Sequence, residues 1–454
     1  MPTPATLLII DDEPQLRQLL ARVLELEGYT VLQAPDAQRG LETLRQHADD
    51  VLVILSDVKL PDGHGVDLVP RYKALAPLAE VVLLTAYGNV PDSVQAIKAG
   101  ASDYLVKGDA DDQLVAVVAR AADKARLQRQ VAALEKRVGL QYSFASMIGT
   151  SAALTQAKTM AEQVAPTDAT VLLEGPTGSG KELFAQAIHQ ASLRKGKPFV
   201  AVNCSAFSRE LLESELFGYR KGAFTGAMTD KKGLIEEANL GTLFLDEIGE
   251  LELGLQAKLL RVLEGQEFIK TGDTKPTRVN VRLVAATNRN LRLEAEQGHF
   301  RADLYYRLSV VVVAVPALSA RRADIPALVS YFNRHFAAKL RKQPLQVSPE
   351  ALHTLVGYAW PGNVRELKNV LERAAILTPA ETPLTVDGLP VELQIAALGP
   401  DTAPSFDDER SLHYVEKQHI IRILRDVAGN KTEAARQLGI GLTTLYRKVQ
   451  EYGL

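Results

Sequence analysis

The sequence predicts a multidomain α/β protein that ends in a small all-α domain. Short apolar runs alternate with amphipathic helical patterns twice, first over residues 1–120 and again from about residue 141 to about residue 316. This alternation predicts two parallel sheets, each covered by helices on both faces. From Pro316 onward the patterns are helical. A chain of 454 residues is long enough for about three domains.

The composition is that of an ordinary globular protein, with 46% hydrophobic and 24% charged residues. A net charge of −3 gives the whole chain no affinity for nucleic acid, so any basic surface must be local. The one cysteine, Cys204, excludes an internal disulfide and suits a reducing compartment. The N-terminus lacks the pattern of a signal peptide, and the longest strongly apolar run, 310–318, is too short to span a membrane. We expect a cytoplasmic protein.

The first α/β region has apolar runs that predict strands at 7–10, 51–55, 80–86 and 103–107. After the first of them, leucines recur at helical spacing until Gly28. A charged stretch follows the region, and its apolar residues also recur at helical spacing: Leu114, Val117, Val118, Ala121, Leu127, Val131 and Leu134. We expect one long linker helix over 121–140. Its periodicity fits pairing with a second copy and a solvated connector equally well.

Five polar residues follow the strands of this region. Asp11 and Asp12 end the first strand, Asp57 ends the strand at 51–55, and Thr85 and Lys107 end the next two. In a doubly wound sheet these ends meet in one crevice. Three carboxylates there would repel one another unless a hard cation such as Mg²⁺ joined them. With a lysine and a hydroxyl, the set can support an acyl phosphate on one aspartate.

These residues resemble those of a response-regulator receiver domain, over residues 5 to 120, whose fold is flavodoxin-like. The resemblance implies that Asp57 is the phosphoacceptor of a cognate histidine kinase. It also implies that Asp11, Asp12 and the backbone carbonyl of Lys59 hold Mg²⁺.

The same resemblance gives Tyr104 the role of an aromatic that reorients together with Thr85. One departure concerns Gly108, which follows Lys107 where the family usually has proline. This departure affects the expected local backbone and leaves the charge of the lysine unchanged.

The second α/β region begins with a glycine-rich loop between a strand and a helix, which is the context of a P-loop. Its expected ATP-binding residues are Gly175, Pro176, Thr177, Gly178, Ser179, Gly180, Lys181 and Glu182. Backbone N–H groups at such a loop bind phosphates, and Lys181 neutralises their oxygens. Glu182 stands where a serine or threonine usually supplies a hydroxyl to Mg²⁺.

Two acidic residues, Asp246 and Glu247, close an apolar strand of the same region. We assign Asp246 to the Mg²⁺ of a bound nucleotide and Glu247 to the base that orients the attacking water. Asn288 ends a neighbouring strand. Together with the P-loop, these residues predict an ATPase.

Between the P-loop and this acidic strand lies a loop of small residues with one phenylalanine: Gly222, Ala223, Phe224, Thr225, Gly226 and Ala227. An ATPase core has no need of an apolar side chain there. The stretch 213–227 resembles the loop with which bacterial enhancer-binding AAA+ activators contact sigma-54 RNA polymerase. These activators also typically have glutamate after the P-loop lysine, as Glu182 is here. The resemblance implies an AAA+ core with a helical lid.

Further roles follow from the same resemblance. Asn288 resembles the sensor that positions the attacking water, and Asn203 the switch that holds Glu247 in an unproductive pose; the alternative for Asn203 is a turn residue at a strand end. Arg365 resembles a sensor of bound nucleotide in the lid.

Arg301 and Arg307 lie in a segment that resembles the arginine finger of the family, and the sequence does not rank them. A finger that acts in a neighbouring subunit implies a ring, a hexamer by resemblance, while the inactive form is expected to be a dimer.

The C-terminal part of the chain predicts a DNA-binding domain. We expect the ATPase domain over 141–388, a Pro-, Thr- and Asp-rich linker over 389–410 and a helix–turn–helix within 411–454, where seven Lys and Arg face four Asp and Glu. Leu438, Ile440 and Leu445 are placed to join two helices. The residues expected to face DNA are Thr443, Thr444, Arg447 and Lys448. The segment resembles a Fis-type domain.

The whole chain resembles the NtrC-like activators, which implies ATP-driven promoter opening from enhancer DNA under control of a receiver. Two other classes were weighed. A DNA-binding repressor with a merely oligomerising core would have degenerate acids or lack the 222–227 loop. An AAA+ remodeller or helicase loader would need neither a receiver nor a helix–turn–helix. The sequence leaves open the stimulus, the kinase, the target genes and whether the receiver represses the core or assembles it.

Overall fold

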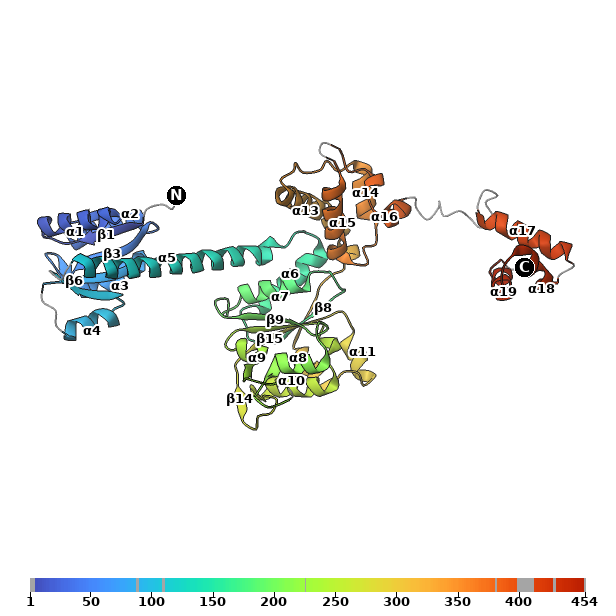
Figure 1. Cartoon of the computed structure of the whole chain (residues 1–454), viewed down its shortest axis with the longest axis horizontal. Helices are drawn as coiled ribbons and strands as arrows, with labels where there is room; N and C mark the ends of the chain where they lie inside the picture. The colour runs from blue at the N-terminus through green and yellow to red at the C-terminus, as the bar shows by residue number, and fades with distance from the viewer. Residues whose placement is uncertain are drawn as a thin grey trace. The chain divides into compact units, whose positions relative to one another are not determined.

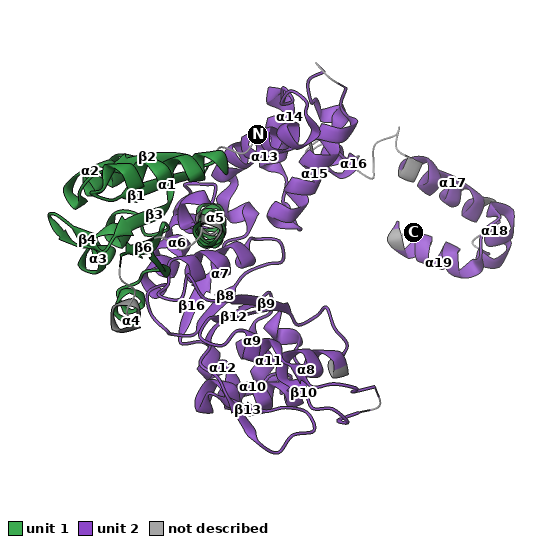
Figure 2. Cartoon of the chain, turned by 60° about the vertical axis from the view of Figure 1, so that its left-hand side comes forward, with its two compact units in different colours: residues 1–141 green, residues 142–454 purple. Residues whose placement is uncertain are grey.

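The computed structural model describes residues 5–86, 90–107, 111–224, 226–379, 382–397, 412–427 and 430–452. The chain divides into two compact units, residues 1–141 and residues 142–454, which Figure 2 shows in green and purple. Figure 1 labels many of the helices and strands of both units. Within the part of the chain that is described, no helix is long and apolar enough to cross a bilayer.

The first unit is built on a five-stranded sheet in the order β2-β1-β3-β6-β7. Its strands are β1 (Thr6–Ile10), β2 (Thr30–Ala34), β3 (Val51–Asp57), β6 (Glu80–Thr85) and β7 (Asp103–Val106). All neighbouring strands are parallel, so their carboxyl ends meet at one edge. This is the flavodoxin-like order that the sequence predicted.

Helices cover both faces of this sheet because its strands are apolar on both sides. Leu7 and Ile9 of β1 enter one core with α1 (Pro14–Leu26) and α5 (Asp111–Gln141). Leu8 and Ile10 enter the other core. Three helices lie on that second side: α2 (Ala37–His47), α3 (Gly65–Leu75) and α4 (Val90–Lys98). A small hairpin of β4 (Lys59–Leu60) and β5 (Gly63–His64) follows β3.

The long helix α5 has two different halves. Its first half packs on the sheet, with Val118, Ala122 and Ala125 fully buried. Its second half exposes Leu127 and Leu134, at 62% and 60%. Receiver packing therefore extends past the expected boundary at residue 120, and one helix serves both as the last receiver helix and as the linker.

The second unit begins with another parallel five-stranded sheet, in the order β16-β8-β15-β12-β9. Its strands are β8 (Val171–Glu174), β9 (Phe199–Asn203), β12 (Thr242–Asp246), β15 (Arg282–Thr287) and β16 (Val311–Ala314). This order places the ends of β8, β15 and β12 side by side. One face packs on α6 (Ala152–Val164) and α7 (Lys181–Gln190).

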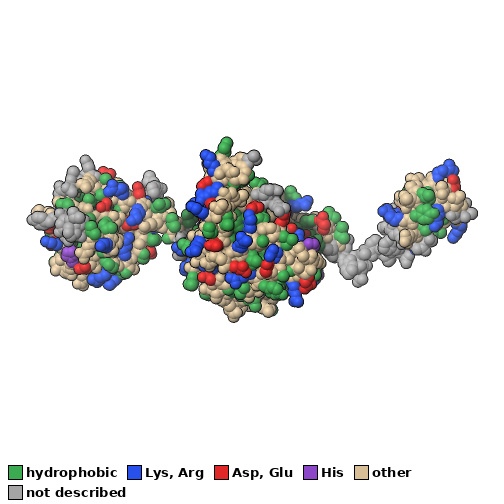
Figure 3. All heavy atoms as spheres, turned by 90° about the horizontal axis from the view of Figure 1, so that it is seen from below, with side chains coloured by type: hydrophobic (Ala, Val, Ile, Leu, Met, Phe, Trp, Pro, Cys, Tyr) green, Lys and Arg blue, Asp and Glu red, His purple; other side chains and the backbone are tan. Residues whose placement is uncertain are grey.

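The opposite face of that sheet packs on a larger group of helices. They are α8 (Arg209–Phe217), α9 (Leu234–Glu237), α10 (Leu253–Gly265), α11 (Leu291–Glu296) and α12 (Ala302–Leu308). Short 3-10 turns, η1 (Phe144–Ser146) and η2 (Ile248–Glu250), complete the core. On the face seen in Figure 3, cationic and acidic side chains are interspersed over this core.

Two small antiparallel ladders extend the core. One pairs β10 (Gly218–Tyr219) with β11 (Lys231–Lys232), and the 222–227 loop lies between these strands. The other pairs β13 (Glu267–Ile269) with β14 (Pro276–Arg278). A bridge between Tyr219 and Thr271 joins the two.

The helical lid packs around Trp360, which is 1% exposed and donates its indole N–H to Leu355 O at 2.7 Å. Its elements are η3 (Leu318–Asp324), α13 (Ile325–Leu340), α14 (Pro349–Gly357), α15 (Asn363–Leu377), η4 (Val386–Gly388) and α16 (Val391–Ala397). Leu389 and Leu393 belong to its core. The linker expected over 389–410 is therefore wrong for residues up to 397, and 398–411 lie outside the described residues.

The C-terminal helices are α17 (Leu412–Asp426), α18 (Lys431–Leu438) and α19 (Leu442–Glu451). Asn430 caps α18, and Gly439, at φ 67°, ends it with the left-handed turn that favours glycine. Leu445 is fully buried, and Leu438 and Ile440 pack against it, so the predicted helix–turn–helix is confirmed.

Candidate functional site

The crevice of the first unit brings the predicted carboxylates together. Oxygen atoms of Asp11, Asp12 and Asp57 lie within 4.8 Å of one another. Asp11 and Asp57 are buried and Asp12 is exposed. Lys107 Nζ lies 2.9 Å from Asp11 Oδ2 and 2.6 Å from Asp57 Oδ2. It also lies 3.2 Å from Glu13 Oε1, a contact that the sequence analysis missed although Glu13 follows the acidic pair directly.

Burial and pairing oppose each other in this crevice. Burial raises the pKa of Asp11, against the hydrogen bond and the charge of Lys107. Burial would lower the pKa of Lys107, but its hydrogen bonds to Asp57 and Asp11 outweigh that effect and raise it. One ammonium thus balances three carboxylates only in part. An all-oxygen donor set with excess negative charge fits Mg²⁺.

The remaining predicted receiver residues lie at or near the same edge. Thr85 ends β6 and is buried. Tyr104 packs against the α2–α3 core, and its buried hydroxyl has no hydrogen-bond partner among the described residues. The backbone N–H of Lys59 donates to Asp57 Oδ1 at 3.2 Å. An inward tyrosine without a polar partner is able to reorient without breaking a hydrogen bond.

The P-loop connects β8 to α7 and depends on its glycines. Gly178 and Gly180 have φ of 77° and 108°, in the region that L side chains rarely adopt. A Cβ on Gly178 would also collide with Gly362 O of the lid. The helix begins at Lys181, so its free N–H groups face the loop where phosphates would bind.

Lys181 rests on its own loop, where its Nζ donates to Gly175 O at 2.8 Å and to Pro176 O at 3.2 Å. Burial lowers the pKa of this lysine, and the charges of Asp246 and Glu247 oppose that shift. Its hydrogen-bond acceptors are neutral carbonyls, so a phosphate group would be a better partner.

The acidic pair occupies the adjacent strand end. Burial raises the pKa of Asp246, and the charge of Lys181 opposes this. Glu247 has φ 55°, a left-handed conformation that is costly for a residue with a side chain. Its N–H donates to Asp246 Oδ1 at 3.0 Å. Glu182 is exposed, and its Oε1 accepts from Gln186 at 3.3 Å within α7.

Two asparagines were assigned roles near these acids. Asn288 Nδ2 donates to Thr177 Oγ1 at 3.1 Å, so it contacts the P-loop directly. Asn203 Oδ1 accepts from the N–H and hydroxyl of Ser205, at 2.9 and 2.8 Å. Among the described residues no hydrogen bond joins Asn203 to Glu247. In this structure Asn203 therefore forms the strand-end turn that was its alternative interpretation.

The lid contacts the P-loop through Asn363, a residue that the sequence analysis missed. Asn363 is 3% exposed with φ 53°. Its Nδ2 donates to Thr177 O at 3.0 Å, and its Oδ1 accepts from Leu318 N at 2.8 Å. The sequence offered one signal for this contact. The Trp360-Pro361-Gly362 turn interrupts the helical pattern directly before α15, which indicates a special role for the start of that helix.

Backbone and arginine contacts complete this junction. Val364 N donates to Gly178 O at 3.1 Å, and Arg321 Nη2 donates to Ser179 O at 2.8 Å. A Cβ on Gly178 would lie 3.0 Å from Arg365 Cβ, so the predicted sensor stands beside the loop. A shift of the P-loop must therefore reach the lid.

Asp324 fastens the lid to the start of α6. Its Oδ1 accepts from the N–H groups of Thr150 and Ser151, at 2.8 and 2.9 Å, and its Oδ2 accepts from the Ser151 hydroxyl at 2.6 Å. Asp324 is 2% exposed. Besides the contact with the P-loop, this is a second place at which the lid is hydrogen-bonded to the core.

The two candidate finger arginines belong to the α12 segment and are exposed. Arg301 donates to both oxygens of Asp303, at 3.1 and 2.7 Å. Arg307 Nη2 donates to the backbone carbonyl of Leu263 at 3.0 Å. Among the described residues, neither arginine bonds to Lys181 or to the acidic pair of the same chain.

The 222–227 loop presents its phenylalanine at the surface. Gly222 N donates to Ala227 O at 2.9 Å, and Ala227 N donates to Phe224 O at 3.1 Å. Gly222 and Gly226, with φ of 85° and 107°, permit this tight closure. Phe224 is 47% exposed, and its ring centroid lies 4.9 Å from that of Tyr219. The loop is therefore supported at its base while Phe224 stays accessible.

The other described residues in and beside the loop differ in how far they are exposed. Ala223 is half-buried and Ala227 is buried at 6% exposure. Thr225 lies outside the described residues. Met228, just after the loop, is 80% exposed and was not among the predicted contact residues.

The helix–turn–helix exposes only part of the expected DNA face. Thr443 and Arg447 are exposed and Thr444 is half-buried. The expectation that Lys448 is exposed is wrong. Its Nζ lies 2.9 Å from Glu416 Oε2 of α17, and its side chain is 17% exposed. This lysine joins α19 to α17, because its position on α19 faces the first helix.

Two residues of this domain were missed. Tyr446 is 52% exposed, and Lys431 Nζ lies 4.9 Å above its ring. Lys431 is the first residue of α18, and Tyr446 precedes Arg447 on α19. On the face seen in Figure 3, Lys and Arg side chains lie at several places on these C-terminal helices, beside an apolar patch.

Comparison with known families decides the class of the chain. Four family models match in order: the response regulator receiver domain over 7–119, the sigma-54 interaction domain over 147–314, the AAA+ ATPase lid domain over 319–404 and the Fis family of bacterial regulatory proteins over 411–452. The transcriptional regulatory protein ZraR of Escherichia coli is 40% identical over 450 residues, 98% of each chain. The chain belongs to the sigma-54-dependent response regulators.

Other relatives agree along the whole length. AlgB of Pseudomonas aeruginosa, an alginate biosynthesis regulator, is 40% identical over 448 residues, 99% of this chain and 98% of AlgB. The crystal structure of NtrX from Brucella abortus with ATP covers 100% of both chains, at 35% identity and a TM-score of 0.66. A second NtrX structure contains ADP, with a TM-score of 0.65 and the same identity and coverage.

As a sigma-54-dependent response regulator, the protein is a phosphorylation-regulated transcriptional activator. Its central domain is an AAA+ ATPase that binds ATP, and its receiver accepts a phosphoryl group. Its C-terminal domain binds DNA, and the family interacts with sigma-54 and with histidine kinases.

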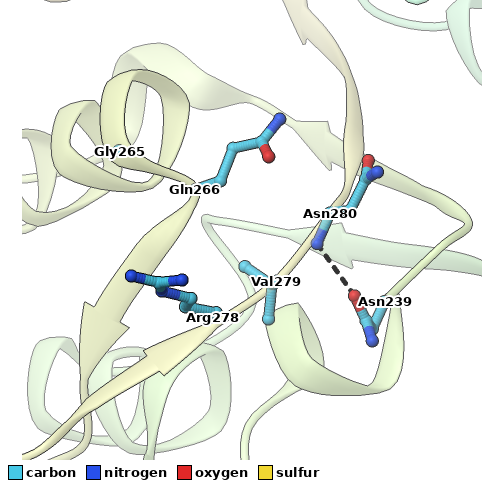
Figure 4. Close-up of a pocket in the computed structure, with 6 residues that line it drawn as sticks. All are labelled: Asn239, Gly265, Gln266, Arg278, Val279 and Asn280. Carbon is cyan, nitrogen blue, oxygen red and sulfur yellow. Dashed lines mark hydrogen bonds between the residues drawn. The ribbon is translucent and has the colours of Figure 1, made fainter.

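Two further hollows on the AAA+ core fall outside the predicted sites. One, of about 360 Å³, is lined by Asn239, Gly265, Gln266, Arg278, Val279 and Asn280, and Figure 4 shows the Asn280 N–H donating to Asn239 Oδ1 at 2.8 Å. A larger cleft, of about 870 Å³, lies between α10 and the β13–β14 ladder, with Phe217, Phe268 and Lys258 in its lining. Neither contains a P-loop residue.

Proposed function

We propose that phosphorylation of Asp57 lets the AAA+ domains assemble into a ring, in which ATP hydrolysis moves the 222–227 loop against sigma-54. The domains responsible are the receiver (1–120, with packing that continues along α5), the linker half of α5 (to 140), the ATPase domain with its lid (141–397) and the DNA-binding domain (411–454). The accessible Phe224 on a loop of an ATPase core carries this proposal. Because the partners are bacterial polymerase and DNA, the protein acts in the cytoplasm.

In the receiver, an oxygen of Asp57 forms a bond to phosphorus while the bond to the kinase histidine breaks. Asp11, Asp12, Asp57 and the Lys59 carbonyl would hold Mg²⁺, which supplies positive charge to the phosphoryl oxygens. Lys107 moves from pairing with the carboxylate to pairing with the phosphoryl group. Its present 2.6 Å contact with Asp57 Oδ2 supports this.

Inward Tyr104 and buried Thr85 supply the response to phosphorylation. Thr85 turns its hydroxyl toward the phosphoryl group, and the tyrosine ring follows into the space this opens. The tyrosine hydroxyl supports the proposal because, among the described residues, it has no hydrogen bond of its own that the movement of the ring would break.

In the AAA+ core, residues 175–182 hold ATP, with Lys181 on the β and γ phosphates. Glu247 accepts a proton from the attacking water, and Asn288 orients that water. Asp246 would hold the Mg²⁺ that accompanies ATP; its carboxylate at the end of β12 suits this hard cation. Arg365 senses the nucleotide from the lid, and Asn203 releases its turn to restrain Glu247.

The active assembly is a ring, which we propose to be a hexamer, and the inactive form is a dimer. An arginine of the α12 segment, Arg301 or Arg307, reaches the γ-phosphate of the neighbouring subunit. Their exposure, away from their own P-loop, supports action in trans. Exposed Leu127, Val131 and Leu134 recur at heptad-like spacing on α5 and support a dimer through this helix.

The C-terminal domains bind enhancer DNA through Thr443, Thr444 and Arg447. Lys448 holds α19, the helix that carries these three residues, against α17. Exposed hydroxyl and guanidinium groups on one helix support contacts to phosphates and base edges.

The decisive experiment measures promoter opening by the purified full chain with the sigma-54 holoenzyme, ATP and a kinase or small phosphodonor. We expect Thr225→Ala to keep ATP turnover and lose promoter opening. Asp57→Ala should take up no phosphoryl label. Opening without sigma-54, or opening by the Thr225→Ala protein, would refute the proposal; repression without opening would favour a repressor.

A further inference from the structure

Arg220 stands where β10 enters the loop that contains residues 222–227. Its Nε donates to Asp273 Oδ2 at 2.7 Å, and its Nη1 donates to Asp230 Oδ2 at 2.5 Å. Its backbone N–H donates to Thr271 O at 3.0 Å. We name residues 220–230 the finger loop and residues 270–275 the hairpin loop. One guanidinium thus joins the two ends of the finger loop and also joins it to the hairpin loop.

Both carboxylates are oriented before they meet the arginine. Asp230 Oδ1 accepts from the N–H of Lys221 at 2.8 Å. Asp273 Oδ1 accepts from the N–H groups of Thr274 and Lys275, at 2.8 and 3.1 Å. Each aspartate therefore presents its other oxygen in a fixed direction, which suits the rigid fork of an arginine.

The two loops also touch through their backbones. A Cβ on Gly272 would lie 2.7 Å from Ala223 Cβ, so the hairpin loop passes directly against the finger loop. Gly272 has φ 77°, which favours glycine independently of this contact. Steric contact keeps the loops from approaching further, while Arg220 keeps them from separating.

The hairpin loop is continuous with the ATPase centre along a short stretch of chain. Glu247 is followed by η2, then α10, then β13 and the hairpin loop. The side chain of Glu250 in η2 pairs with Arg289 Nη2 at 2.5 Å, next to Asn288. One helix and one strand thus connect the acidic pair to Asp273 along the chain.

We propose that Arg220 is a positioning residue that clamps the finger loop to the hairpin loop, so that the two move as one body when the ATPase turns over. This rests on the proposed role of the 222–227 loop in contacting sigma-54. An isolated exposed ion pair contributes little. Here two oriented carboxylates share one guanidinium. The geometry of these hydrogen bonds therefore fixes the position of one loop relative to the other, in addition to the attraction between the charges.

The test uses full-length Arg220→Ala, Asp273→Asn and the charge exchange Arg220→Asp with Asp273→Arg. We expect ATP turnover within about twofold of wild type and promoter opening reduced about tenfold in the single variants. The exchanged pair should not regain opening, because the new carboxylate at position 220 would face Asp230 and the new guanidinium could not accept from the Thr274 and Lys275 N–H groups. Arg220→Lys should fall between wild type and Arg220→Ala, because an ammonium lacks the planar fork.

Arg278→Ala is the matched control. Arg278 lies on β14 of the same ladder, is labelled in Figure 4, and has a 90% exposed side chain whose contact to Glu267 is 3.8 Å long. We expect this variant to turn over ATP and open promoters normally. Normal opening by Arg220→Ala, or a parallel loss of ATP turnover, overturns the clamp. Retained opening by Thr225→Ala overturns the proposed function instead, so the two failures are distinguishable.

Discussion

The receiver crevice and the nucleotide site each place a lysine at the carboxyl edge of a parallel sheet, with opposite surroundings. Lys107 meets Asp11 and Asp57 within 2.9 Å, and these hydrogen bonds raise its pKa despite burial. Lys181 meets only backbone carbonyls of its own loop, and burial lowers its pKa. Among the described residues, the first lysine has hydrogen-bonded anionic partners, whereas the second has none.

This difference indicates what each site still requires. The receiver brings its predicted side chains together at one sheet edge, so under the proposed function it would still need a phosphodonor and a divalent cation. The AAA+ site has its acids, its lysine and the predicted sensor Arg365 together, but not the two candidate finger arginines. In the proposed ring it would need both a nucleotide and a second copy of the chain.

The largest expected effect tests that incompleteness. Arg307→Ala should lower ATP turnover about 10³–10⁵-fold, because a finger guanidinium stabilises charge that develops only during transfer. We expect a smaller loss for Arg301→Ala, since Asp303 already holds that guanidinium through two hydrogen bonds. Steady-state ATP hydrolysis measures both.

Mixing distinguishes action in trans from action within one subunit. Arg307→Ala protein mixed with Glu247→Gln protein should regain ATP turnover, because some sites then combine an intact acid with an intact finger. If every mixture stays as inactive as its components, the finger acts within its own chain or does not act at all.

The next effect isolates the lysine without an internal partner. Lys181→Ala should lower ATP turnover about 10²–10³-fold, since the positive charge that faces the phosphates is lost. Phosphoryl uptake by Asp57 should be unchanged in the same preparation, which serves as the internal control. A loss of labelling would show that the substitution damages more than the nucleotide site.

The opposite lysine should matter for stability. Lys107→Met leaves Asp11 and Asp57 without their shared cation, and loss of one partner of a buried pair costs about 3–5 kcal/mol. Hydrogen exchange of residues 5–86 in the full chain, without Mg²⁺, measures this. Unchanged protection would contradict the assigned pairing.

Alkaline pH should separate the same two lysines without mutation. The pKa of Lys107 is raised in the folded state, so its contribution is complete below about pH 10.4, the ordinary value, and is lost as the pH rises through the folded pKa. The pKa of Lys181 is lowered, so the cost of its burial is relieved as the pH rises through the folded value. P-loop amides should therefore gain protection below about pH 10.4, whereas receiver amides should lose protection only above it.

Sequence reasoning succeeded where function depends on position along a strand or helix. Asp57, Lys107, Lys181 and Asp246 all stand at element ends, and the order of elements alone brings such ends together. The element order also gave both sheets, because apolar strands that alternate with helices have few ways to pack.

It failed where a side chain serves a tertiary junction. The partner of Asn363 is Thr177, 186 residues away, so no local pattern shows the contact. Arg220 is one of many charged surface residues in the sequence, and its partner Asp273 lies 53 positions on. The helix α16 was assigned to a linker because its Pro-rich flanks outweighed the two leucines that reach the lid core.

The smallest expected effect concerns the DNA-binding domain, where one cationic side chain is exposed and the next is already paired with a carboxylate. Arg447 is exposed, whereas Lys448 is paired with Glu416 at 2.9 Å. If Arg447 contacts one phosphate, Arg447→Ala should reduce the slope of log affinity against log salt by about one. Lys448→Ala should leave that slope unchanged and instead weaken the packing of α19 on α17.

Fluorescence anisotropy with enhancer DNA over a salt series measures the slope, and hydrogen exchange of residues 442–451 measures the packing. A salt slope that changes for Lys448→Ala and not for Arg447→Ala would reverse the two roles, and would mean that the Glu416 pair opens when DNA binds.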